Sequence, residues 1–447
     1  MGIGAKALRT IRPFTGLVKH PLLRMTGAVV WVCTLGGVFA ALVPSQVTER
    51  GYPAWLGLAL LLGGLLTVAF VLLDFERATF LSFTLMGFVR IEPAPFDLLM
   101  MLLLGIGLLT GRLRYPARPR AMGFRVGLWG LALASIASAI GVMPIGHSLR
   151  FLIISLYVLA LCAFVRMYAF TEAGVRRVVN GYVISAVVSS LLVVVGFLGI
   201  GPAQRLFLKY GIRAQGFFKD PNVFAPFLIF PILLITDRVI RRPFSWKYTV
   251  PRVILIILLC NSVVLSFSRG AWINLALSGF VYLGLLSRLI PRRKTAALVF
   301  SLTLIALIVV LSVQLAGLGS FVSERGHLKK SYDEQRFENQ ATGVIAGLSH
   351  IMGVGPGRWP NTHSLYACTL AEHGLPGLAM LVVLSASVVR GLSRQAWQEP
   401  LQVEILPTRV LLSCLVGQLV NSFVIDSIHW RHLWVLMGLA WVSLENR

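Results

Sequence analysis

The chain has 447 residues, of which 57% are hydrophobic and 13% charged, and its formal net charge is +24. This composition excludes the soluble globular classes and indicates a polytopic membrane protein. The sequence lacks the stretches of alternating polar and apolar residues, about ten residues each, that form the strands of a membrane barrel. We therefore expect an all-α fold with a single integral membrane domain over residues 1–447.

Apolar stretches long enough to cross a bilayer, about 20 residues each, recur along the whole chain. We predict spans at Thr26 to Pro44, Ala54 to Leu73, Phe96 to Thr110, Phe124 to Val142, Leu149 to Phe170, Val178 to Gly199, Asn222 to Val239, Val253 to Phe267, Gly270 to Leu289, Ala296 to Leu318, Ser364 to Val389, Leu406 to Phe423 and Ile428 to Leu444. The short segment Thr79 to Val89 is either a tilted span or half of a re-entrant hairpin with the next helix. The expected total is about 12 to 14 spans. One long loop, residues 319–363, joins the spans Ala296 to Leu318 and Ser364 to Val389.

Lys and Arg gather in every second connection, provided that Thr79 to Val89 crosses the membrane. The basic clusters are Arg112, Arg114, Arg118 and Arg120; Arg166, Arg176 and Arg177; Arg238, Arg241, Arg242, Lys247 and Arg252; Arg288, Arg292, Arg293 and Lys294; and Arg390 and Arg394. Basic connections normally face the cytoplasm. The external side then receives residues 201–221, the Ser268-Arg269 turn, residues 319–363 and residues 426–432.

The external connections are nevertheless rich in cations. They carry Arg205, Lys209, Arg213, Lys219, Arg269, Arg325, Lys329, Lys330, Arg336 and Arg358. A lone cation at a helix end often extends to the interface, and a solvated loop face is the favoured interpretation for Lys329 and Lys330. Arg213 and Arg269 lie close to predicted membrane boundaries, where lipid phosphate is the nearest abundant anion and suits the guanidinium fork. They predict an external pocket for an anionic, lipid-borne group such as a diphosphate.

A shaped loop precedes His363. Three glycines and two prolines within residues 353–360 prevent a continuous helix and deliver His363 to the start of the next span. The histidine is either a helix cap or a general base, because its side chain titrates near neutrality. Glu372 follows within the apolar segment, where it either pairs with an arginine such as Arg269 or is catalytic; we favour the pairing.

Several common catalytic motifs are missing from the sequence. No glycine-rich phosphate loop with a following Lys and Ser/Thr is present, and no His/Cys cluster has metal-ligand spacing. The first external loop, residues 46–52, carries only Glu49 and hence no carboxylate pair. We expect no cofactor, no metal and no nucleic-acid partner, and we expect arginines to stabilise a departing diphosphate.

Motifs along the second half of the chain resemble those of the bacterial O-antigen ligase and O-antigen polymerase superfamily. They are Arg213 to Asn222, Ser268-Arg269-Gly270, the Gly353 to Gly357 loop running to His363, Glu372 to Gly377, and Asp426 to Arg431. The resemblance covers roughly Gly201 to the C-terminus, while the first half is similar only in general hydropathy. Members often place Asn after the motif histidine, where this chain has Ser364.

The resemblance implies an inverting, metal-independent glycosyl transfer at the external face of the bacterial cytoplasmic membrane. The donor would be an undecaprenyl-diphosphate-linked glycan and the acceptor a saccharide, either a lipid A core or a growing glycan. Arg213 and Arg269 would bind the diphosphate, and His363 would activate the acceptor hydroxyl. Glu372, Arg336 and Arg358 are candidate supporting residues.

Other functions remain open at this point. The superfamily also includes polymerases and protein-glycosylating members, and we favour a ligase over a polymerase. A flippase for lipid-linked oligosaccharides would also need a cationic cavity, but it would be expected to have an internal repeat, which the sequence lacks. A non-catalytic assembly factor is a third hypothesis.

Overall fold

The computed structural model describes residues 54–113, 121–315, 317, 331–359, 362–403 and 405–446. The predicted span Thr26 to Pro44 lies outside these residues. The described helices are α3 (Ala54–Leu73), α4 (Phe75–Thr84), α5 (Pro95–Leu109), α6 (Met122–Ala139), α7 (Ile145–Tyr168), α8 (Glu172–Phe197), α9 (Ala203–Phe207), α10 (Pro221–Ile240), α11 (Trp246–Leu265), α12 (Arg269–Leu286), α13 (Arg292–Leu315), α15 (Ser331–Ser349), α16 (Leu365–Gln398), α17 (Thr408–Asn421) and α18 (Arg431–Asn446). One small antiparallel hairpin, β1 (Leu208–Lys209) with β2 (Arg213–Ala214), departs from the expected all-α fold.

Several described helices have the length and composition of membrane spans. Within the described residues, 7 helices are long and apolar enough to cross a bilayer: α6, α7, α8, α10, α11, α12 and α16. Shorter apolar helices occur at Gly63–Leu73, Pro95–Leu109 and Thr408–Asn421. A multi-pass membrane protein is thereby supported, while the total of about 12 to 14 spans stays a prediction. The ambiguous segment Thr79 to Val89 overlaps α4, whose ten residues extend only about 15 Å, half of the hydrocarbon thickness.

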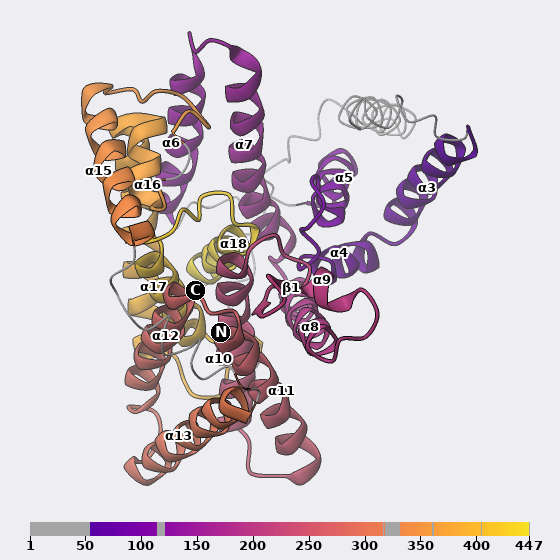
Figure 1. The fold of residues 1–447 in the computed structure, drawn as a ribbon, viewed down its shortest axis with the longest axis vertical. Helices are drawn as coiled ribbons and strands as arrows, with labels where there is room; N and C mark the ends of the chain where they lie inside the picture. Colours follow the sequence, from indigo (N-terminus) through magenta and orange to yellow (C-terminus); the bar gives the residue numbers. More distant parts are fainter. Residues whose placement is uncertain are drawn as a thin grey trace, which may run out of the picture.

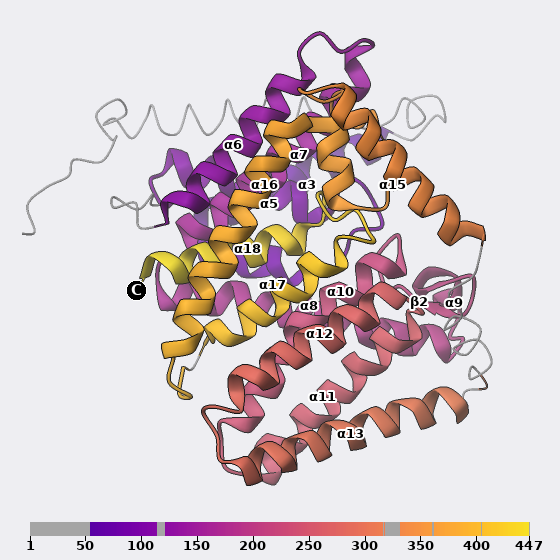
Figure 2. The same ribbon diagram turned by 90° about the vertical axis from the view of Figure 1, so that its left-hand side faces the viewer.

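The helices form groups along the long axis of the molecule. Figures 1 and 2 show α6, α7, α15 and α16 toward one end of that axis and α11 and α13 at the other, with α10, α17 and α18 between them. The pairs α6 with α16, α12 with α17 and α7 with α18 pack extensively. Gly127 allows the first pair to approach closely, because a Cβ there would lie 2.6 Å from the backbone nitrogen of Leu384. Small residues of this kind are common where membrane helices cross.

The predicted long loop 319–363 contains a helix. Residues 331–349 form α15, which packs against α16. Its first half is polar, with Glu334, Arg336 and Glu338, so the sequence reads as a solvated connection rather than as a span. Its apolar side chains, such as Phe337 and Ile345, are largely exposed. Gly343 of α15 lies against Trp359 and Thr362, which precede His363.

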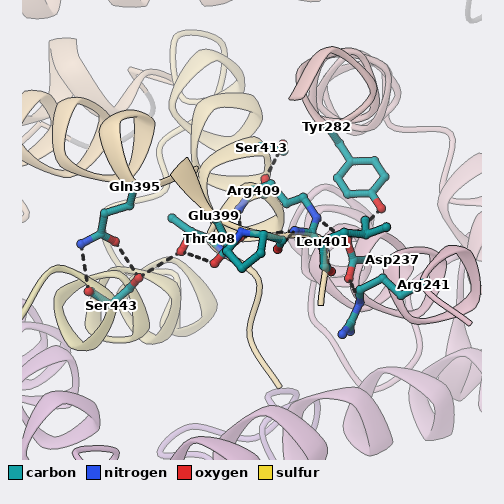
Figure 3. Close-up of polar contacts among 11 residues, drawn as sticks. Asp237, Arg241, Tyr282, Gln395, Glu399, Leu401, Thr408, Arg409, Ser413 and Ser443 are labelled. Carbon is teal, nitrogen blue, oxygen red and sulfur yellow. Dashed lines mark hydrogen bonds and ion pairs between the residues drawn. The ribbon is translucent and has the colours of Figure 1, made fainter. Parts of the chain in front are cut away.

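A buried ionic cluster joins the helix ends remote from residues 213 and 269 (Figure 3). The guanidinium of Arg409 is fully buried and donates from Nε to Asp237 Oδ1 at 2.7 Å. The same oxygen accepts a hydrogen bond from Tyr282 Oη at 3.0 Å. Glu399 receives the Thr408 backbone N–H at 2.9 Å and lies 3.5 Å from Arg409 Nη1. This cluster, hereafter the buried clamp, connects α10, α12 and α17 with the segment after α16.

Candidate functional site

Arg213 is positioned by the β1–β2 hairpin against the turn between α11 and α12. Its side chain is only 8% exposed. Nε donates to the carbonyl oxygen of Ser266 at 2.9 Å, and Nη2 lies 3.5 Å from the carbonyl oxygen of Phe267 and from Asn222 Oδ1. Because two of these partners belong to the turn itself, Arg213 holds the segment that carries Arg269.

The turn before Arg269 is built from short polar side chains. Phe267 has φ 51°, an uncommon conformation for a bulky residue. Ser268 is the N-cap of α12, and its hydroxyl accepts the backbone N–H of Ala271 at 3.4 Å. Arg269 is therefore the first residue of α12, at the positive end of the helix dipole. A helix N-terminus with neighbouring guanidinium groups favours an anion.

The same turn packs against the end of α17. A Cβ at Gly270 would lie 2.6 Å from Asn421 Oδ1, so the side chain of Asn421 lies directly against the backbone of Gly270. The backbone N–H of Leu365, at the start of α16, donates to the carbonyl oxygen of Ser422 at 2.9 Å. The residues after α17 thus lie between the α11–α12 turn and the segment that contains His363.

His363 lies between α15 and the connection from α17 to α18. Its backbone has φ 49°, and its carbonyl oxygen accepts a hydrogen bond from Gln340 Nε2 at 3.2 Å. Gln340 Nε2 also lies 3.3 Å from the carbonyl oxygen of Phe423. Arg336 is one helical turn before Gln340 on α15, so both side chains occupy the same face of that helix. Gln340 therefore ties this face of α15 to the backbone of His363.

The surroundings of His363 keep its imidazole neutral. Partial burial lowers the pKa of His363 below its usual value, and the nearby charge of Arg336 lowers it further. Asp426 and Asp220 oppose these effects, but the net pKa shift is downward. The lowered pKa favours the unprotonated ring, which is the state that a general base requires.

Asp220 connects the surroundings of Arg213 with those of His363. It caps α10, accepting the backbone N–H of Asn222 at 2.7 Å, and it forms an ion pair with Lys209 at 2.8 Å. Its charge also acts on His363. The sequence-predicted residues Arg213, Arg269, Arg336 and His363 are thus brought to one region, formed by β2, the α11–α12 turn, α15 and the residues after α17.

The glycine-rich loop is fixed by residues that were expected to support the site. Gly353, Gly355 and Gly357 all have positive φ, between 73° and 100°. Glu372 Oε1 accepts a hydrogen bond from the backbone N–H of Trp359 at 3.3 Å. The carbonyl oxygen of Glu372 accepts a hydrogen bond from the backbone N–H of Gly355 at 3.1 Å. The predicted pairing of Glu372 with an arginine such as Arg269 is not found among the described contacts of Glu372, because its carboxylate faces backbone N–H groups of the loop.

Arg358 anchors the other side of this loop. Its Nε donates to Ser148 Oγ at 3.1 Å and its Nη2 to the carbonyl oxygen of Pro144 at 2.9 Å. His147 Nε2 lies 2.9 Å from the carbonyl oxygen of Gly357. These bonds join the loop to the start of α7. Arg358 therefore acts on the loop's position instead of joining Arg213 and His363.

Two residues of the site region, Gln340 and Asp426, were not predicted from the sequence. Gln340 lies in α15, within the stretch that was predicted to be a loop, so no helical face was assigned to it. Asp426 lies in the Asp426 to Arg431 motif, but its relation to His363 depends on tertiary packing. In the described part of the chain, no group of three or more His, Cys, Asp or Glu residues is arranged to hold a metal ion.

Comparison with known proteins finds one family that part of the chain resembles. Residues 254–382 match the family model described as O-Antigen ligase. The match includes Arg269, Arg336, His363 and Glu372, and it leaves Arg213 and Asp426 outside. No curated protein matches the chain. The resemblance of this chain to the O-antigen ligase and polymerase superfamily is thereby confirmed.

Proposed function

We propose that the chain, whose residues 254–382 match the O-Antigen ligase family model, is a glycosyltransferase that moves a glycan from undecaprenyl diphosphate to a saccharide acceptor. The reaction takes place at the external face of the bacterial cytoplasmic membrane. The observation that supports this proposal is the convergence of the Arg213-bound α11–α12 turn, which carries Arg269, with a neutral His363. These segments supply an anion-binding end and a base within one region.

The proposed reaction requires one proton transfer and one displacement. His363 accepts the proton of the acceptor hydroxyl while the hydroxyl oxygen attacks the anomeric carbon of the donor glycan. The bond between that carbon and the diphosphate oxygen breaks, and the configuration at the carbon inverts. The electron pair leaves with undecaprenyl diphosphate, whose increased charge is stabilised by Arg213, Arg269 and the N-terminus of α12. The arginines take the place that a divalent cation has in metal-dependent transferases.

The proposed site is tested by transfer assays on the protein in lipid nanodiscs. We expect His363→Ala to lower kcat by about 10²- to 10⁴-fold, the usual contribution of general base catalysis. Arg269→Ala should lower transfer by at least about tenfold, because the leaving diphosphate loses a charge-assisted contact. Arg205→Ala, an exposed arginine on α9, is the matched control and should retain activity. Wild-type activity in both the His363 and Arg269 variants would contradict the proposed site.

The glycan phenotype of a deletion strain separates the related functions. A lipid A core that carries no polymer indicates a ligase, which we favour. Single repeat units on the core indicate a polymerase. Accumulation of the donor on the external side of the membrane argues against a flippase, since a flippase deletion would leave the donor on the cytoplasmic side.

A further inference from the structure

A separate cavity lies beside the proposed transfer site. It has a volume of about 200 Å³ and lies between the α4–α5 connection, the segment that enters α10, and the α17–α18 connection. Phe218, Val223, His429, Trp430 and His432 are among its lining residues. The catalytic proposal uses none of them. With this volume, the cavity is smaller than a typical site for a drug-sized ligand, roughly 300–1,000 Å³.

The cations that line this cavity are already neutralised by carboxylates. Lys219 Nζ lies 2.9 Å from Glu92 Oε2. The guanidinium of Arg431 forms an ion pair with Asp97, which also accepts a hydrogen bond from Tyr157 Oη at 2.8 Å. Net charge at the cavity is thus balanced, in contrast to the arginine-rich region around Arg213. A neutral ligand suits the cavity better than a phosphate does.

One buried polar atom of the lining has no internal partner. Nε2 of His432 is buried and forms no hydrogen bond within the described residues, although His432 is only 3% exposed. A buried polar group without a partner is costly, and such groups in native structures often mark a ligand or functional site. Trp430 lies next to His432, with ring centroids 5.1 Å apart and the ring planes inclined by 36°. Aromatic faces combined with a few uncharged polar atoms match the apolar and hydroxyl faces of a sugar ring.

The cavity and the site around His363 share their walls. Phe218 and Val223 flank Asp220, whose charge acts on His363. His429 and Trp430 follow Asp426, which also acts on His363. The two chain segments therefore contribute to the surroundings of His363 and to the cavity at once.

We propose that this cavity binds one neutral sugar ring of a glycan substrate, while the arginine region binds the diphosphate. This assignment rests on the proposed transferase function. The sugar belongs either to the donor or to the acceptor, and both sources offer the same chemistry. The cavity thus determines which glycan is positioned for transfer, without a direct part in the chemical step.

Kinetics with cavity variants test the assignment. In His432→Phe the ring remains and the unpartnered nitrogen is removed, so the melting temperature should equal or exceed that of the wild type. The KM for one glycan should nevertheless rise at least about tenfold, a loss that a purely structural role would not produce. Val223→Trp, which fills the cavity, should have the same effect, and Val126→Trp, at an exposed position on α6, is its control. A rise confined to the donor or to the acceptor identifies the source. Unchanged KM values for both glycans in both variants would overturn the proposal.

A binding measurement separates this proposal from the transfer mechanism. Saturation-transfer NMR is recorded with glucose and N-acetylglucosamine on the His363→Ala variant in nanodiscs, since maltoside detergents would themselves supply sugar. We expect sugar signals from the His363→Ala variant. The signals should disappear when Val223→Trp is combined with His363→Ala, and they should persist when Arg269→Ala is combined with it. Inorganic phosphate should not displace them. Signals that are insensitive to Val223→Trp would contradict sugar binding in the cavity, even if the wild-type protein transfers glycan. A signal that depends on the cavity, together with a wild-type protein that transfers no glycan, would refute only the transferase function.

Discussion

At the scale of single residues, Arg213 has a role that its charge alone does not suggest. It donates to the backbone of the α11–α12 turn, so it orders the segment that carries Arg269 as well as adding charge to it. The sequence placed Arg213 and Arg269 near a membrane boundary and named His363 by its glycine-rich approach. It did not reveal Gln340 or Asp426, because each acts on His363 through contacts that join segments remote in the chain.

Replacing Arg213 by lysine tests this double role. An ammonium group retains the charge but lacks the planar fork that reaches the carbonyl oxygens of Ser266 and Phe267. We expect a loss of at least about tenfold in kcat/KM for the donor, measured by transfer at low donor concentration. Lys209→Arg, in the neighbouring strand, is the control with the reverse exchange. Full activity of Arg213→Lys would show that only the charge matters.

The pH dependence of transfer tests the protonation state of His363. A general base acts when it is unprotonated, so kcat/KM should rise with pH through the pKa of His363 and level off above it. Arg336 lowers that pKa, so Arg336→Gln should move the acidic limb to higher pH. Asp426 raises it, so Asp426→Asn should move the limb to lower pH. If the acidic limbs of the pH profiles coincide in the wild type, Arg336→Gln and Asp426→Asn, His363 is excluded as the titrating group.

At the scale of elements, apolar length predicted the helices well and their interruptions poorly. The predicted span Ala54 to Leu73 has the bounds of α3, and Asn222 to Val239 lies within α10. By contrast, α15 was missed because its first half is polar. A kink interrupts α16 within the Glu372 to Gly377 motif. Its form depends on Gly374, which has φ 68° and lies against residues 351–353. Such contacts join elements and leave no local pattern.

The glycine-rich loop offers a prediction about its shape. Gly353 has φ 83°, and a Cβ there would lie 2.4 Å from the carbonyl oxygen of Glu372. Gly353→Ala should therefore displace the loop from α16, with a cost of about 1–3 kcal/mol in stability and a loss of transfer. Gly146→Ala, on α7, has open space around it and ordinary backbone angles and should be neutral. Thermal unfolding and transfer rates of the two variants provide the comparison, and equal values would contradict the structural requirement.

At the scale of the whole molecule, the helix order follows from the sequence but the packing partners do not. Residue 213 contacts residues 266 and 267, and residue 365 contacts residue 422, although no periodicity links these segments. The buried clamp was likewise unforeseen. Asp237 and Arg409 lie near the ends of predicted spans, where charges are usually exposed, and their pairing requires that α10 and α17 be neighbours.

The buried clamp predicts a large effect of one substitution on stability. Arg409→Met would leave Glu399 without its arginine and Asp237 with Arg241 alone, at a cost of about 3 kcal/mol. We expect a clearly lower melting temperature in nanodiscs. Arg394→Met, at an exposed position of α16, is the matched control and should melt near the wild type. An unaltered melting temperature of the Arg409 variant would contradict a stabilising role of Arg409 and would show that Arg241, solvent or protonation compensates the carboxylates.

The position of the buried clamp bears on whether the protein is a transporter or a transferase. A transporter with alternating access rocks its helical halves apart, first on one side of the membrane and then on the other. Here α10 and α17 are joined by buried charges, and α12 by the Tyr282 hydroxyl, at the end remote from residues 213 and 269. Separating α10 from α17 would remove Arg409 from Asp237, which would keep only Arg241 of its own helix as an ionic partner. The helix ends are held together at the buried clamp, whereas residues 213 and 269 lie in a short hairpin and at a turn. This arrangement agrees with the proposed transferase, in which both substrates enter and the product leaves on the same side of the protein.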